Sequence, residues 1–217
     1  MVTRLSGGRA PVEFEFVAGN LALDFANTDH NYGADDPQDD LQAYSDLIGW
    51  GRQSGLLREG ESRRLLRAAQ TRPASAAHDL RRARALRAVL YHVFSSIALT
   101  GKADSQALGR FNSRLRRALA GANLERAGPQ YALGWEEHGQ IDRLLCQLIH
   151  AATNLLTSER LGRLRQCAGD NCTWLFVDTS RNGKRRWCDM RACGNRAKVR
   201  RFRQRGAAGA SGRGSSA

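Results

Sequence analysis

The sequence lacks any apolar run close to the roughly 18–20 residues that a helix needs to cross a bilayer. Its start, MVTRLSGGRAPVEFEF, also lacks the apolar stretch of about 7–15 residues that a secretory signal carries. We therefore expect a cytoplasmic protein with no membrane partner. With 41% hydrophobic and 25% charged residues over 217 positions, the composition excludes a collagen-like or wholly disordered chain and is typical of a soluble protein with a core.

Recognisable catalytic motifs are missing as well. The chain has no G-x-S-x-G, no phosphate-binding loop and no dinucleotide fingerprint. The histidines show no metal-binding spacing; they are His30, His78, His92, His138 and His150. We do not expect an enzyme, and an enzyme without a known motif stays only an alternative to a binding or regulatory protein.

Acidic residues are scarce in the C-terminal quarter of the chain. Residues 160–217 hold 15 of the 34 lysines and arginines but only three of the 21 acidic residues, and so carry +12 of the net charge of +13. Residues 1–159 are close to neutral. This asymmetry predicts a polyanionic partner for the C-terminal quarter and an ordinary soluble domain before it.

Helical patterns dominate the neutral part. Apolar residues recur at steps of three and four in the segments 41–54, 61–70, 76–99, 104–120 and 139–161. The clearest, 76–99, has an opposite face that is basic: Arg81, Arg82, Arg84 and Arg87. Within the apolar pattern of 139–161 stands a single cysteine, Cys146, which we expect in the core.

Short extended segments accompany these helices. Residues 12–28 contain two apolar runs that resemble strands, residues 29–40 form an acidic, turn-rich segment that predicts a loop, and residues 122–137 predict a hairpin centred on Gly128-Pro129. We expect an α+β fold in which residues 1–158 make a mainly helical domain with a small antiparallel sheet. Such a domain is a candidate effector sensor or homodimerisation module.

A candidate effector site follows the second apolar run, where a strand would end. It comprises Asp24, Asn27, Thr28 and His30. Polar side chains at a strand end often line a ligand pocket. The alternative interpretation is that these residues cap a helix and keep the loop polar.

Four cysteines with the spacing C-x4-C-x15-C-x4-C lie in the basic quarter: Cys167, Cys172, Cys188 and Cys193. Two close pairs joined by a longer loop can place four thiolates around one tetrahedral zinc ion. Free reduced thiols and an iron–sulfur cluster remain alternatives, although the small polar turn at 167–172 favours zinc.

The sequence between the two pairs predicts a β-hairpin. Trp174 and Phe176 alternate as on one strand, Asn182-Gly183 is a strong turn signal, and Arg185–Trp187 would form the returning strand. Three aromatic side chains make too small a core for about 40 residues. We therefore expect one structural zinc ion per chain, which would contribute an apparent ~10–16 kcal/mol.

A basic helix is predicted after the last cysteine, over residues 195–205. Val199 and Phe202 share a face that we expect to pack on the zinc unit, while a solvated charged tail is the alternative. A cationic helix held by a zinc site suits the phosphates of duplex DNA, with Asn195 and Arg196 nearest the base edges. The predicted DNA-binding residues are Arg181, Lys184, Arg185, Arg186, Asn195, Arg196, Lys198, Arg200, Arg201, Arg203 and Arg205.

These motifs closely resemble the CGNR zinc finger, whose name is the tetrapeptide at Cys193–Arg196. The segment Asn20–Thr28, NLALDFANT, is similar to the opening of the ABATE domain that commonly precedes this finger. The resemblance implies a bacterial, stress-related transcription regulator with an ABATE-like domain over 1–158, the finger over 159–205 and a disordered tail over 206–217. Such a regulator would be nucleoid-associated when bound to DNA.

An RNA-binding or ribosome-associated zinc protein is the alternative function. Single-stranded RNA is bound by stacking on exposed aromatic rings. Because Trp174, Phe176 and Trp187 have the pattern of core residues, the sequence favours duplex DNA.

Overall fold

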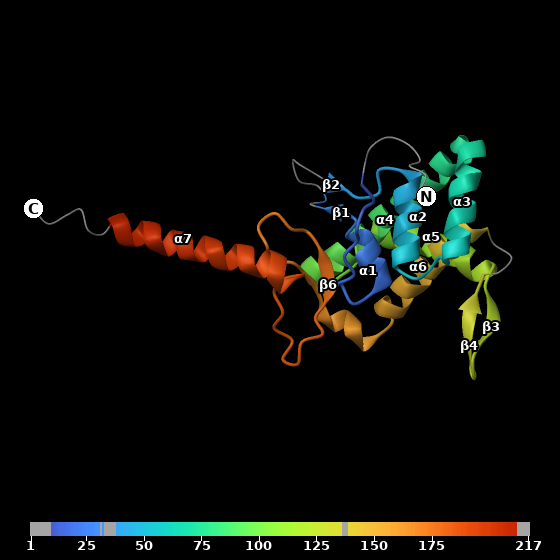
Figure 1. Cartoon of the computed structure of the whole chain (residues 1–217). Helices are drawn as coiled ribbons and strands as arrows, with labels where there is room; N and C mark the ends of the chain where they lie inside the picture. Colours follow the sequence, from blue (N-terminus) through green and yellow to red (C-terminus); the bar gives the residue numbers. More distant parts are fainter. Residues whose placement is uncertain (1–9, 31, 33–37, 136–138, 212–217) are drawn as a thin grey trace, which may run out of the picture.

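The computed structural model describes residues 10–30, 32, 38–135 and 139–211, the residues from Arg205 on by their backbone alone (Figure 1). All five helical segments predicted in the first 158 residues are confirmed. They form α2 (Tyr44–Gln53), α3 (Glu59–Thr71), α4 (Pro73–Thr100), α5 (Ser105–Ala120) and α6 (Gln140–Leu156).

The central element is α4, against which α1, α2, α3, α5 and α6 all pack. It begins with Pro73 in its first turn, where the missing N–H costs nothing, and ends at Gly101, whose φ of 77° is left-handed. Its apolar face is buried as predicted, from Leu80 to Phe94. Its basic face is not wholly solvated, because Arg87 is only 4% exposed and binds Asp29 and Asp39. A buried guanidinium needs such carboxylate partners.

The strands of the described residues are short and antiparallel. They form three two-stranded sheets: β1 (Asp29–His30) with β2 (Gln38–Asp39), β3 (Asn123–Ala127) with β4 (Gln130–Gly134), and β5 (Leu164–Gln166) with β6 (Leu175–Val177). The predicted hairpin at 122–137 is confirmed as β3–β4, with Gly128 at a φ of 64° in its turn, while residues 136–138 lie outside the described residues. The predicted loop over 29–40 instead contains the short β1–β2 pair, and its residues 31 and 33–37 are outside the description. Together the helices and small sheets confirm the α+β class.

The strand-like interpretation of residues 12–28 is wrong. Residues 11–17 are extended but form no strand, and Leu21–Ala26 is a helix, α1. The Asn20 side chain begins this helix by accepting the Ala22 N–H, and Asn27 stands at its other end. Because α1 has six residues, it is too short for its apolar pattern to separate a helix from a strand.

The C-terminal segment is not an independent small domain. The β6 strand is fully buried and belongs to one hydrophobic core with α1 and α4. The expectation that three aromatics make the finger's own core is therefore corrected, since Phe176 and Trp174 pack into the core of the helical body. Sequence reasoning treated the segment alone, and long-range burial is what enlarges its core.

The last helix, α7 (Asn195–Ser211), projects away from the body (Figure 1). The expectation that Val199 and Phe202 pack on the zinc unit is wrong, because they are 50% and 80% exposed. The helix also continues past Arg205, where the Gly/Ala/Ser-rich tail was expected to begin, and residues 212–217 lie outside the description. No helix among the described residues is long and apolar enough to span a membrane.

Candidate metal centre and nucleic-acid interface

Four cysteine sulfurs gather at the base of α7. The Sγ atoms of Cys167, Cys172, Cys188 and Cys193 all lie within 4.8 Å of one another. Cys188 Sγ is 3.7 Å from Cys172 Sγ and 3.6 Å from Cys193 Sγ. Tetrahedral zinc with Zn–S bonds of about 2.3 Å requires sulfurs about 3.8 Å apart, so the observed separations fit this ion.

The charge state of the sulfurs also fits a cation. Hydrogen bonds from the Cys172 and Cys188 thiols lower the pKa of Cys167 to about 2, and the bond to Cys167 raises the pKa of Cys172 to about 12. Hydrogen bonding among the sulfurs therefore favours the thiolate form of Cys167 and disfavours that of Cys172. A dication removes this conflict by letting all four sulfurs be thiolates.

The β5–β6 hairpin holds the first cysteine pair in its loop. Cys167 follows β5, Cys172 precedes β6, and the Cys167 N–H donates to the Trp174 carbonyl at 2.8 Å. A Cβ atom at Gly169 would lie 3.2 Å from Cys193 Sγ, so glycine lets this turn approach the sulfur cluster closely. A small hairpin is present at the metal site, but it is not the predicted one: β6 pairs with residues 164–166, and the predicted pairing with Arg185–Trp187 across Asn182-Gly183 does not occur. Leu164 of this strand is buried in the core. It precedes Cys167, so it lies outside the segment between the two cysteine pairs, in which the hairpin was predicted.

The three acidic residues of the basic quarter are all engaged, which sequence reasoning missed. Fully buried Asp178 accepts hydrogen bonds from the Ser180 N–H and hydroxyl and from the Arg185 N–H, and the Ser180 hydroxyl lowers the pKa of its carboxyl. Asp189 accepts from the backbone N–H groups that begin the Met190–Gly194 π-helical turn around Cys193. Asp170 pairs with Arg200. The sequence did contain an indication of these contacts, because an isolated acidic residue in a strongly basic segment is expected to have a local bonding partner.

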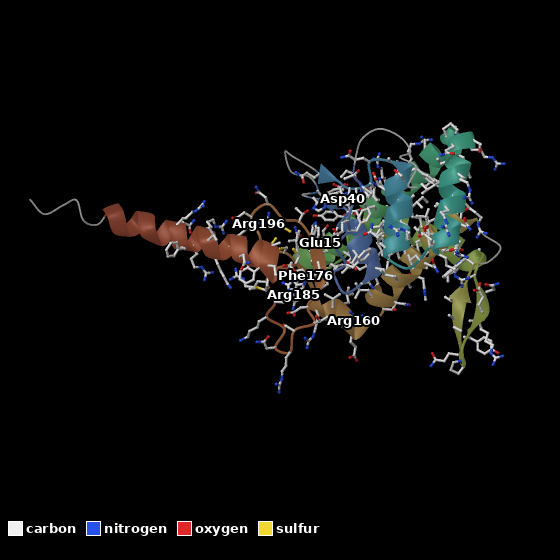
Figure 2. All side chains as sticks on the ribbon, in the orientation of Figure 1. Glu15, Asp40, Arg160, Phe176, Arg185 and Arg196 are labelled. Atoms are coloured by element: carbon white, nitrogen blue, oxygen red, sulfur yellow. The ribbon has the colours of Figure 1, made fainter. Side chains whose placement is uncertain are left out.

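Three of the predicted DNA-binding arginines have partners within the protein: Arg200, which pairs with Asp170, and Arg185 and Arg196. The Arg185 guanidinium lies 4.4 Å from the Phe176 ring centre and donates to the carbonyls of Val17 and Cys188, joining the finger to the body (Figure 2). Arg196 Nη2 donates to Cys193 Sγ at 3.1 Å, and this bond raises the pKa of Arg196. A donor on a metal-bound thiolate orients the ligand and balances its charge.

The other predicted contact residues lie on the surface. Arg186 stacks over Trp187, and Asn195 begins α7. Those that are exposed cations whose side chains make neither a salt bridge nor a hydrogen bond among the described residues are Arg181, Lys184, Arg186, Lys198, Arg201 and Arg203. Arg205 lies in α7, but its side chain is outside the description. Arg191, an exposed cation in the turn before Cys193, was not singled out from the sequence.

The candidate effector residues lie at the contact between the body and the finger. Asn27 pairs with Leu175 of β6 through both amide atoms, at 2.9 and 2.8 Å. The Thr28 hydroxyl donates to Phe25 and accepts from Arg87, and His30 Nε2 is 2.6 Å from an Asp40 carboxylate oxygen. A cavity of about 500 Å³ lies elsewhere, between α4, α5 and α6.

Replacing Asn27 by Ala is expected to destabilise the protein by about 2–5 kcal/mol, because it leaves one buried N–H and one buried carbonyl of Leu175 without partners. Urea unfolding measures the change. Asn112→Ala, at an exposed position of α5, is the matched control and should stay within about 0.5 kcal/mol. Equal stability of the two variants would mean that the Asn27 pairing contributes nothing.

Asp24 makes the folding stability of the protein depend on pH. Its carboxylate accepts the Ala18 N–H at 2.8 Å, and burial raises its pKa from 3.8 to about 6. Between these values the folded state holds a proton that the unfolded state releases, so stability falls as pH rises and levels off above pH 6. From pH 5 to pH 7 the wild type should lose about 1 kcal/mol relative to Asp24→Asn. If the free energies of unfolding of the wild type and Asp24→Asn changed equally between pH 5 and pH 7, this prediction would be wrong.

Comparison with known families matches both parts of the chain. The ABATE family, described as "Putative stress-induced transcription regulator", matches residues 19–159, and the CGNR zinc finger matches residues 163–206. No curated protein matches the chain significantly. The first match runs from the residue before Asn20 to the end of the helical body, and the second covers all four cysteines. The order and nature of the two parts predicted from the sequence are confirmed, and the four cysteines form a structural zinc site.

Proposed function

The chain belongs to the ABATE family and ends in a CGNR zinc finger, and from this premise we propose that it is a transcription regulator that binds duplex DNA through the finger. The observation that carries the proposal is the set of exposed, unpaired cations beside the zinc site, on α7 and the 178–187 loop. In water alone these like charges repel one another, and phosphates would neutralise them.

The shape of α7 supports a major-groove contact. Beyond its first turns, which contact the zinc-site loop, the helix projects away from the body (Figure 1). A helix with its side chains is about 10–12 Å wide, which matches the roughly 12 Å width of the groove. Lys198, Arg201 and Arg203 are assigned to phosphates. Asn195 and the remaining donors of Arg196, at the end held by zinc, are assigned to base edges.

One observation favours the RNA-binding alternative. Phe202 is 80% exposed among the cations of α7, and an exposed ring is what a single-stranded base stacks on. Fluorescence anisotropy with a labelled 20-base-pair duplex DNA and with a 20-nucleotide RNA of the same sequence separates the two functions. We expect the duplex to bind at least tenfold more tightly. Tighter RNA binding that Phe202→Ala abolishes would replace our proposal with the alternative.

The helical body is assigned the regulatory part, as the receptor of a small effector or the contact between two copies. It is nearly neutral and holds the cavity of about 500 Å³, within the range of small-molecule sites. The protein would act in the cytoplasm, at the nucleoid. Size-exclusion chromatography with light scattering gives its oligomeric state.

A further inference from the structure

We propose that the cavity bounded by α4, α5 and α6, called here the helix groove, binds a small amphipathic carboxylate and is the effector site of the protein. Its role as an effector site rests on the proposed regulatory function, whereas ligand binding in the groove does not. The groove lies within the helical body and away from the polar residues that the sequence pointed to.

The floor of the groove is apolar. It includes Leu86 of α4, Ala118 of α5 and Leu145 and Ile149 of α6. Cys146 completes it, and burial raises the pKa of this thiol to about 11, so it stays neutral. A ligand must therefore present an apolar body to this surface.

The rim of the groove is cationic. Arg82 is neutralised by ion pairs with Asp142 and Asp79, so it adds no free charge. Arg114 and Arg117 of α5 make no ion pair among the described residues, and both line the groove. Two unneutralised guanidinium groups next to an apolar floor are the complement of a carboxylate on an apolar body.

Arg114 is the rim residue best placed to receive an anionic group. Its guanidinium is half-buried and donates one hydrogen bond, to the Arg110 carbonyl at 3.2 Å. Burial, together with the charges of Arg117 and Arg110, lowers its pKa. A partly desolvated cation surrounded by like charge is unfavourable until an anion pairs with it.

Other ligand classes fit less well. An inorganic anion would pair with the arginines and leave the apolar floor in water, while a neutral apolar molecule would cover the floor and leave Arg114 unpaired. A cation would be repelled by the rim. A ligand with both an apolar body and an anionic group such as a carboxylate satisfies both surfaces.

The groove is connected to the finger by a single rigid element. Leu86 lines the groove, and α4 also packs on β5 and β6. Tyr91, five residues after Leu86, stacks on Tyr32, whose N–H donates to Thr173 Oγ1 beside the zinc ligand Cys172. Five residues of helix span about 7–8 Å. A ligand that shifts α4 at the groove therefore acts directly on the strand and loop that hold the zinc site.

The binding experiment uses the full-length zinc protein, isothermal titration calorimetry and two probes, octanoate and 2-naphthoate. Octan-1-ol and 2-naphthol are the matched neutral molecules. We expect at least one carboxylate to bind at least tenfold more tightly than its neutral counterpart. Equal binding of the members of both pairs, or no binding of either carboxylate, would overturn the proposal.

Three variants locate the site. Arg114→Ala should weaken carboxylate binding at least tenfold, whereas Arg116→Ala, at an exposed position of the same helix that does not line the groove, should change it less than twofold. Ala85→Trp, at an exposed position on the α4 wall, should block the groove without changing charge. Circular dichroism checks folding. Full binding by either Arg114→Ala or Ala85→Trp would place the ligand elsewhere and overturn the proposal.

The regulatory role is tested by the affinity for the 20-base-pair duplex with and without the bound carboxylate. A change of at least threefold that is absent in Ala85→Trp is expected. An unchanged affinity would overturn the effector role and leave groove binding in place. Failure of the protein to bind duplex DNA at all would refute the proposed function. The calorimetric result would still decide whether the helix groove binds a carboxylate.

Discussion

Cys188→Ser is expected to remove the zinc ion and to lower the stability of the whole chain, not of the finger alone. Cys188 Sγ lies within 3.7 Å of two other ligand sulfurs, and a hydroxyl is a poor replacement for a thiolate. Structural zinc contributes an apparent ~10–16 kcal/mol in isolated finger peptides, which is comparable to the total stability of a typical domain.

The effect should reach the helical body because the two parts share a core. From the sequence alone we expect loss of zinc to spare residues 1–158. In the structure β6 is buried against α1 and α4, and Asn27 pairs with its backbone, so an unfolded finger exposes the apolar faces of these helices. We therefore expect one unfolding transition, with a midpoint at least about 10 °C lower than in the wild type.

Elemental analysis and thermal unfolding by circular dichroism measure the two effects. The wild type should contain about one zinc per chain and the variant almost none. Cys146→Ser is the matched control, because Cys146 is a buried cysteine of α6 outside the cluster, and it should retain the zinc. A zinc-free Cys188→Ser protein that still melts like the wild type would show that the finger and the body are independent.

Raising salt from 50 to 200 mM is expected to weaken duplex binding roughly 250- to 1,000-fold. The estimate assumes that the cations of α7 and the 178–187 loop neutralise ~5 phosphates, which gives a slope of log K against log salt of about −4 to −5. The six exposed cations without a salt bridge in this part of the described structure are sufficient for that number. Arg185, Arg196 and Arg200, which have partners within the protein, are not needed for it.

The combined variant Lys198→Ala, Arg201→Ala and Arg203→Ala should reduce the slope to about −1 to −2, and Arg203→Ala alone should reduce it by about one. The matched control removes the same charge from the exposed surface of the body, by Lys102→Ala, Arg110→Ala and Arg116→Ala. It should keep the wild-type slope. Salt-independent binding, or equal loss in the two triple variants, would show that net charge and not the finger surface determines the affinity.

The metal ligands, the order of the two parts, the five long helices and the β3–β4 hairpin were determined by the sequence alone. Each rests on a local pattern: paired cysteines at a spacing that suits one ion, apolar residues repeating at helical steps, or a turn that requires glycine. Charge composition can also be counted from the sequence, so the basic C-terminal quarter could be recognised without the structure. These features do not depend on which distant residues they meet.

The tertiary structure alone decided what those elements contact. It made α1 a helix, buried Arg87, paired β6 with residues 164–166, and joined Asn27 to Leu175 across 148 positions of the chain. It also left Phe202 in solvent and formed the helix groove from three helices. An apolar or charged residue in a sequence shows only that it needs a partner. The fold supplies the partner, because burial and ion pairing depend on atoms that are adjacent in space and remote in the chain.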